Sequence, residues 1–302
     1  MKKKRPIYVA TEIETSMEEL WEYTQNPDIH TEWDARFAEI SYLEKKEGEP
    51  QRFLYKTKVG LGLEIAGEGE SIGEIRKETG ERISSLKFWT GNKLSLIQIG
   101  RGYWKYTPDG EYIHFETQYD YDTRFGGIGK VIDLYVFRPL LGWATAWSFD
   151  ALKLWLEKGL HPSLLIRRAM TYWLVCFLFA FVWLYQGIVP KIIFTHPEEV
   201  KMLSVFVGSN ESSIFILKIV GFLEMIFGVI WILPLQKRKL FILHIIMLIV
   251  LAIVAGFTNI SSFTQPFNPI TLNFVLIGLS FIGYMNSCDV PSARNCRRTR
   301  RG

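Results

Sequence analysis

The chain has 302 residues, of which 48% are hydrophobic and 15% aromatic, and its formal net charge at pH 7 is only +4. A charge this small does not indicate a nucleic-acid partner, and the three cysteines have neither disulfide nor metal-ligand spacing. The acidic residues are unevenly distributed, because 26 of the 31 lie before residue 169. We therefore expect a polar first half and an apolar second half.

The first part of the chain has the residue pattern of a β-sheet. Residues 7–125 alternate repeatedly between apolar and polar side chains, which is typical of antiparallel strands with one face in water. The pattern predicts an opening strand at Ile7–Ile13, two short helices between Ser16 and Trp33, and about six further strands.

Turn and helix signals complete this unit. Pro108-Asp109-Gly110 predicts a hairpin turn, and the glycines of Gly126–Gly129 predict a flexible loop. A long helix is expected from about Leu140 to Lys158. A curved antiparallel sheet can wrap around such a helix, so we expect an α+β helix-grip fold for residues 1–162.

The inward strand positions and one side of the long helix carry aromatic side chains. Such side chains either line a pocket for an apolar small molecule or fill a core, and the pattern leaves both interpretations open. The candidate ligand-binding residues are Trp33, Phe53, Tyr55, Trp89, Phe115, Tyr119, Trp143 and Trp147.

Motifs that would indicate an enzyme are not found. The chain has no Gly-x-Ser-x-Gly motif, no phosphate-binding loop and no zinc-ligand spacing, and its histidines form no recognisable triad. We expect no catalytic residue, no metal and no cofactor.

The second part of the chain has the composition of membrane-spanning helices. Leu240–Cys288 contains no Asp, Glu, Lys or Arg over 49 residues, which is long enough for two membrane spans. An all-α bundle of four spans is expected within residues 163–288. The predicted spans are at about 169–190, 213–235, 240–258 and 269–286.

The basic residues predict the orientation of these spans. Arg167 and Arg168 precede the first span, residues 237–239 separate the second and third, and five arginines lie in the tail 289–302. In a four-span arrangement all three clusters fall on one face. We expect a multi-pass protein of the cell membrane with both termini cytoplasmic, its tail bound to anionic lipid.

Five polar residues are expected at membrane depth. Glu224 lies near the middle of the second span, where an unpaired carboxylate costs about 2.5–3.5 kcal/mol. Its expected partners are His244 and Gln186, followed by Asn259 and Asn273. Glu224 would either serve a proton, quinone or ligand site, or link helices through a hydrogen bond.

The first half resembles the START-like, or SRPBCC, superfamily, which includes polyketide cyclase-like proteins. The resemblance rests on the opening strand Ile7–Ile13, on Asn26-Pro27 through Trp33, and on Phe125-x-x-Ile-Gly before the final helix. It implies a helix-grip fold with a cavity for a hydrophobic ligand.

The second half resembles the DoxX-like family over about residues 167–287. The similarity lies in Trp183–Lys191, in His196-Pro-Glu-Glu, and in Gly221-x-x-Glu224-x-x-x-Gly228. It implies a membrane bundle and an association with quinol oxidase or thiosulfate:quinone chemistry. Gln186 stands where family members often have His, which weakens a proton or metal role at that position.

Two functions follow as hypotheses. In the first, a cytoplasmic helix-grip domain binds a hydrophobic small molecule or lipid and couples it to the membrane bundle. In the alternative, the chain is an accessory membrane subunit of a quinone-linked oxidoreductase in which Glu224 handles a proton. The expected partners are membrane lipid and an apolar small molecule or, for the alternative, a quinone or a redox partner subunit.

Overall fold

The chain divides into two compact units, Met1–Leu165 with Pro291–Gly302, and Ile166–Val290. Each unit has its own buried core, and each is described by itself. The computed structural model describes residues 5–58, 64–258, 263 and 268–300.

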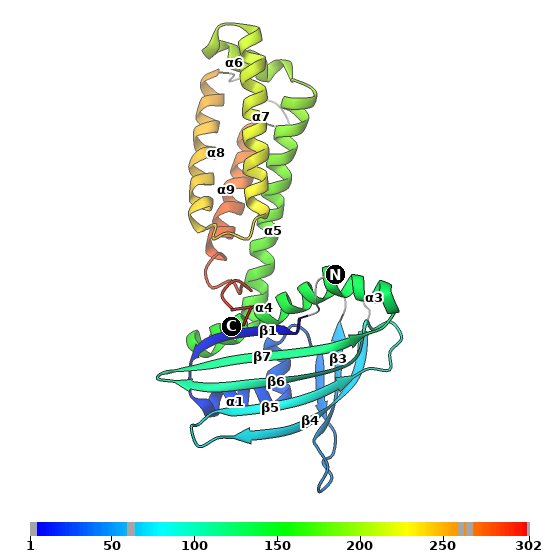
Figure 1. The fold of residues 1–302 in the computed structure, drawn as a ribbon. Helices are drawn as coiled ribbons and strands as arrows, with labels where there is room; N and C mark the ends of the chain where they lie inside the picture. The colour runs from blue at the N-terminus through cyan, green and yellow to red at the C-terminus, as the bar shows by residue number, and fades with distance from the viewer. Residues whose placement is uncertain (1–4, 59–63, 259–262, 264–267, 301–302) are drawn as a thin grey trace. The chain divides into compact units, whose positions relative to one another are not determined.

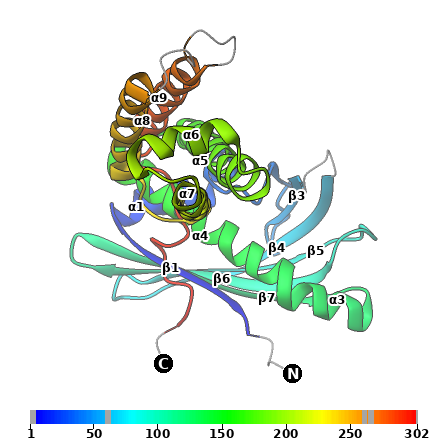
Figure 2. The same ribbon diagram turned by 90° about the horizontal axis from the view of Figure 1, so that it is seen from above.

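The first unit is built on one sheet of seven antiparallel strands in the order β1-β7-β6-β5-β4-β3-β2. Figure 1 shows the strong twist of this sheet, and Figure 2 shows a long helix crossing it. The strands are β1 (Ile7–Glu14), β2 (Glu39–Tyr42), β3 (Arg52–Lys58), β4 (Glu64–Arg76), β5 (Arg82–Trp89), β6 (Ile97–Asp109) and β7 (Tyr112–Thr123).

The helices of this unit begin and end with the expected signals. The Ser16 side chain accepts a hydrogen bond from the Glu19 N–H at 3.1 Å and so caps the first helix. The long helix ends at Gly159, whose φ of 65° is left-handed. The helical elements are α1 (Met17–Gln25), α2 (Pro27–Trp33), α3 (Gly126–Ile132), the π-helical turn η1 (Asp133–Phe137) and α4 (Arg138–Lys158).

Helix α4 packs on the sheet through Ala146, Phe149 and Leu152, all fully buried. Phe149 stacks on Phe115 of β7 with ring centroids 4.4 Å apart. A curved antiparallel sheet around a long helix is the helix-grip fold, and that prediction is confirmed.

The loop predicted at Gly126–Gly129 is wrong, because these residues form the first turn of α3. Phe125 starts the helix in a left-handed conformation with φ of 64°. A Cβ on Gly129 would lie 1.8 Å from the carbonyl oxygen of Arg124. Glycine at this position therefore permits close packing at the helix start, and its pattern was mistaken for loop flexibility.

The tail also lies elsewhere than expected, because the structure places it on the first unit (Figure 1). Arg297 exchanges two backbone hydrogen bonds with Ala10 of β1, at 2.8 and 2.9 Å. Asp150 of α4 accepts bonds from the Ser292 N–H and the Asn295 amide, both at 2.8 Å. The tail extends the edge of the sheet, whereas its arginines had suggested a lipid anchor.

The second unit is helical. Within the described residues, three stretches are long and apolar enough to cross a membrane, namely Pro162–Ile193, Asn210–Ile232 and Arg238–Phe257, while the apolar helix Ile270–Met285 is shorter. These stretches overlap the four spans that the sequence predicts. The elements are α5 (Pro162–Gln186), the π-helical turn η2 (Gly187–Ile193), α6 (Pro197–Val207), α7 (Asn210–Ile232), α8 (Arg238–Thr258) and α9 (Pro269–Met285).

Candidate functional site

The first unit contains a cavity of about 1500 Å³. Small-molecule sites typically measure about 300–1,000 Å³, so this cavity has room for a large apolar ligand. The wall is mainly aromatic and aliphatic, and exposed Leu94, Leu140 and Trp143 lie on it. Further wall residues include Phe53, Tyr55, Phe88, Leu86, Trp104 and Tyr119.

Glycines on neighbouring strands keep this cavity open. Phe53 is paired with Gly69, and a Cβ on that glycine would lie 2.2 Å from the Phe53 ring. Phe88 is paired with Gly100 in the same way, again at 2.2 Å. Because each ring lies flat over a glycine, it covers the sheet without projecting into the space above it.

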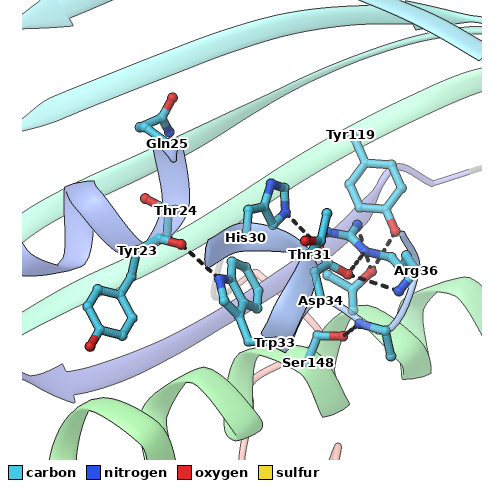
Figure 3. A network of polar contacts seen from close by, with 12 residues as sticks. Tyr23, Thr24, Gln25, His30, Thr31, Trp33, Asp34, Arg36, Tyr119 and Ser148 are labelled. Carbon is cyan, nitrogen blue, oxygen red and sulfur yellow. Dashed lines mark hydrogen bonds and ion pairs between the residues drawn. The ribbon is translucent and has the colours of Figure 1, made fainter. Parts of the chain in front are cut away.

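A buried polar network forms part of the cavity wall (Figure 3). Arg36 donates to both carboxylate oxygens of Asp34, from Nε at 2.8 Å and from Nη2 at 2.5 Å. The Nε2 atom of His30 lies 3.0 Å from Asp34 Oδ2. Arg36 Nη1 also donates to Thr145 at 3.2 Å, and the Thr145 and Tyr119 hydroxyls are 2.7 Å apart.

This network carries little net charge. Burial disfavours the ionised Asp34, but the attraction and hydrogen bonds of Arg36, with help from His30, outweigh burial and hold the pKa of this carboxyl well below its usual range. Burial also opposes the charge on Arg36, yet Asp34 raises the pKa of the guanidinium further. The two groups therefore form a neutralised ion pair, and the wall offers hydrogen-bonding groups to a ligand.

Four of the eight predicted ligand-binding residues lie on the cavity wall: Phe53, Tyr55, Tyr119 and Trp143. Burial raises the pKa of Tyr55 to about 12, so its hydroxyl stays protonated at neutral pH.

The other four are not among the wall residues. Trp33 and Phe115 are fully buried in the core beneath the cavity. Trp89 follows Phe88 on β5 and so faces the other side of the sheet, where the Lys87 ammonium lies 5.3 Å from its ring. Trp147 is half-buried on α4.

The sequence interpretation missed the polar part of the wall, Arg36, and the buried Asp34 that pairs with it. Their signal was an acid and a base two residues apart, directly after the buried Trp33, where a surface turn would more commonly be inferred.

In the second unit, Glu224 has a different partner from those expected. Its carboxylate lies 3.0 Å from the Nζ atom of Lys191, which is also 3.0 Å from Glu199. Lys191 was expected just beyond the end of the first span, but the π-helical turn η2 carries it into a buried position. Close packing brings the two together, because a Cβ on Gly221 would lie 2.9 Å from the Lys191 side chain.

The ring nitrogens of His244 contact residues other than Glu224. The Trp183 indole N–H donates to its Nε2 atom at 3.0 Å, and its Nδ1 atom lies 2.8 Å from the Ser280 hydroxyl. Its ring also contacts Phe179, with centroids 4.4 Å apart, and Trp231, at 5.5 Å. His244 therefore links helices α5, α8 and α9 through hydrogen bonds and ring contacts.

The remaining polar candidates make weaker contacts. The backbone carbonyl of Gln186 accepts a long bond from Lys191 at 3.5 Å, and the Asn273 amide donates to the Leu248 carbonyl at 3.4 Å. Asn259 lies outside the described residues. Among the residues that the structure describes, no group of three or more His, Cys, Asp or Glu side chains could hold a metal ion.

One known protein matches this chain over nearly its whole length. The relative described as "Uncharacterized membrane protein YndG", from Bacillus subtilis (strain 168), is 40% identical over 300 residues, covering 99% of each chain. The chain belongs to the family of this membrane protein. Residues 180–281 also match the model of the DoxX-like family, which confirms the resemblance of the second half.

Solved structures resemble the first half. A STAR-related lipid transfer protein from Xanthomonas axonopodis has 12% identity and a TM-score of 0.39, covering 50% of this chain and 85% of its own. The Zhui aromatase/cyclase from Streptomyces sp. R1128 has 13% identity and a TM-score of 0.35, covering 46% and 87%. The helix-grip fold itself rests on the sheet order and the packing of α4.

Proposed function

We propose that the first unit binds an apolar small molecule or lipid, and that this binding is coupled to the membrane bundle. The observation that carries the proposal is the cavity of about 1500 Å³, whose wall combines flat aromatic rings with the buried Asp34–Arg36 network. Apolar walls with a few placed polar groups are the usual composition of ligand sites. The neutralised ion pair favours a ligand with an uncharged polar group over a strong anion.

Two chain connections support coupling between binding and the membrane. Helix α4, which contributes Trp143 to the wall, is separated from α5 by only three residues, 159–161. The tail that follows α9 returns to the same unit and bonds to Asp150 of α4. A change in the packing of α4 would therefore act on both ends of the membrane segment.

The tail also bears on the topology. Because Arg297 pairs with Ala10 of the first unit, the segment 166–290 must begin and end on one side of the membrane. We infer an even number of crossings, with α9 as the fourth, since its 17 residues extend about 26 Å against a hydrocarbon core of about 30 Å. The distribution of lysine and arginine then favours a cytoplasmic position for both termini.

Binding is tested by filling the cavity. Full-length protein is incubated with a total lipid extract in detergent, and bound molecules are identified by native mass spectrometry. Ser84 lies on the cavity wall, whereas its neighbour Ser85 on strand β5 points to the opposite face of the sheet. Ser84→Trp takes up part of the cavity and should lower the occupancy or select a smaller bound molecule, whereas the matched control Ser85→Trp should retain the wild-type molecule.

Two outcomes would contradict the proposal. One is a wild-type protein that carries no molecule after the incubation. The other is a bound molecule of the same identity and occupancy in the two tryptophan variants, since a bulky side chain added to the cavity wall would then leave the ligand site unaltered. The quinone-linked alternative gains no observation of its own, because Glu224 is already engaged by Lys191 at 3.0 Å.

A further inference from the structure

The helix that leads into α4 has its polar and apolar faces reversed. Within α3, η1 and the start of α4, the charged residues Asp133 and Arg138 are buried, at 3% and 8% exposure. Ile128 and Tyr135 on the same helix are 73% and 70% exposed. A helix packed on a soluble domain normally buries its apolar residues and exposes its charges.

The buried face is held by a complete polar network. Arg138 Nε donates to Asp133 at 3.0 Å, and the Tyr121 hydroxyl donates to the same carboxylate at 2.6 Å. Arg138 also donates to Asp120 at 2.9 Å, and its guanidinium lies 4.4 Å from the centre of the Tyr121 ring. These contacts fix which face of the helix points at the sheet.

The π-helical turn η1 contributes to this arrangement. The backbone N–H of Arg138 bonds to the carbonyl of Asp133, five residues earlier, as in a π-helix. The wider turn puts these two side chains on one face. The apolar residues before and after η1 therefore stay together on the other face.

The exposed side chains follow one another at helical spacing and form an apolar surface, which we call the α3–α4 stripe. Figure 2 shows the course of the helix that carries it. All of its residues are more than two-fifths exposed. They are Ile128, Val131, Ile132, Tyr135, Val136 and Leu140.

We propose that the α3–α4 stripe docks on the bilayer in which this same chain is anchored. Contiguous exposed apolar surface marks a contact site on a soluble domain. Helices with one strongly apolar face bind in the plane of a lipid surface, with that face in the boundary between headgroups and acyl chains. The exposed Lys130 beside the stripe suits an anionic lipid headgroup.

Chain continuity favours the bilayer over other occupants. Only residues 159–161 separate α4 from α5, and three residues reach at most about 11 Å. The stripe lies at the other end of α4, whose 21 residues extend about 32 Å, so it stays within roughly 30–60 Å of α5 and its docking needs no free encounter in solution.

Docking would also give the cavity an entrance from lipid. Ile132 and Leu140 belong both to the stripe and to the cavity wall. An apolar molecule could pass from the bilayer along these side chains without crossing water. The docking itself requires no ligand and stands apart from the proposed binding function.

The test measures what covers the stripe in full-length protein. Single cysteines are introduced as Ile128→Cys and Tyr135→Cys in a Cys288→Ser background, since Cys176 and Cys296 are buried. A matched control is Ile75→Cys on β4, an isoleucine that is 54% exposed and not on the cavity wall. Each variant is labelled with an environment-sensitive fluorophore and reconstituted into nanodiscs of neutral and anionic phospholipid.

The expected result is that labels at 128 and 135 are quenched by doxyl-lipids and protected from aqueous iodide, with blue-shifted emission. The label at 75 should show the reverse. Iodide quenching at 128 and 135 equal to that at 75 would overturn the proposal. Protection from both quenchers would also overturn it, because protein, either this chain or a second copy, would then cover the stripe.

Discussion

The contact between the tail and α4 can be tested through Asp150. Its Oδ2 atom accepts two hydrogen bonds at 2.8 Å, from the Ser292 N–H and the Asn295 amide. Bonds to a charged acceptor contribute at least about 1.5 kcal/mol each, so Asp150→Ala should weaken docking of the tail by about 2–3 kcal/mol once the relief of the buried charge is included. That corresponds to a roughly 30- to 150-fold larger population of the detached tail.

Trypsin reports this population, because the tail contains several arginines and cleavage requires local opening. Intact full-length protein in detergent is digested briefly, and loss of the tail is followed by mass spectrometry. The Asp150→Ala variant should lose it roughly 30- to 150-fold faster than wild type.

The matched control is Asp150→Asn. Burial, partly offset by the bonds from Ser292 and Asn295, raises the pKa of Asp150, so the buried charge is costly. Asparagine keeps an oxygen acceptor and removes the charge, so cleavage should stay close to the wild-type rate. Cleavage of the alanine variant at the wild-type rate would refute the docking contacts. An asparagine variant as labile as the alanine variant would refute the role of the acceptor.

Two further predictions concern the buried ion pairs. Glu224→Leu removes one of the two carboxylates that pair with Lys191 and should lower the free energy of unfolding in detergent by about 1.5–3 kcal/mol, less than for a buried charge left without a partner, because Glu199 remains 3.0 Å away. The double variant with Lys191→Met should recover most of the loss; equal loss in both would contradict the pairing. Because the pKa of Asp34 is depressed in the folded protein, its pairing with Arg36 stabilises the fold above the ordinary carboxyl pKa of 3.8 and is lost as pH falls below it. Acid unfolding is followed by tryptophan fluorescence in both proteins. The stability of Asp34→Asn should depend less on pH below 3.8 than that of the wild type, because the variant has no carboxyl group to protonate at this position. The same pH dependence in both proteins would count against the pair.

The general architecture follows from local patterns. Period-two alternation along β3 and β7 and the cap at Ser16 act over a few residues, so they can be recognised without tertiary contacts. The charge-free stretch Leu240–Cys288 likewise needs only its own composition to indicate membrane helices. The match of residues 180–281 to the DoxX-like family agrees with this interpretation.

The cavity wall could be predicted only in part. Alternation assigns Phe53 and Tyr55 to the inner face of β3, but it cannot tell a wall residue from a core residue such as Phe115. That difference depends on how far α4 stands from the sheet at each position. It also depends on cross-strand glycines such as Gly69, whose register is a tertiary property.

The sequence by itself determined that the chain has a first part suited to water and a second part suited to lipid, because hydropathy and charge are local properties of the chain. Only the tertiary structure decided that Lys191 pairs with Glu224, that Arg297 returns to β1, and that the helix after β7 buries its ion pair while exposing its apolar side. The first two features join residues that are far apart in the sequence, and the third is the rotation of a helix about its axis. Such features depend on packing and on the cost of burying an unpaired charge, which no local pattern reports.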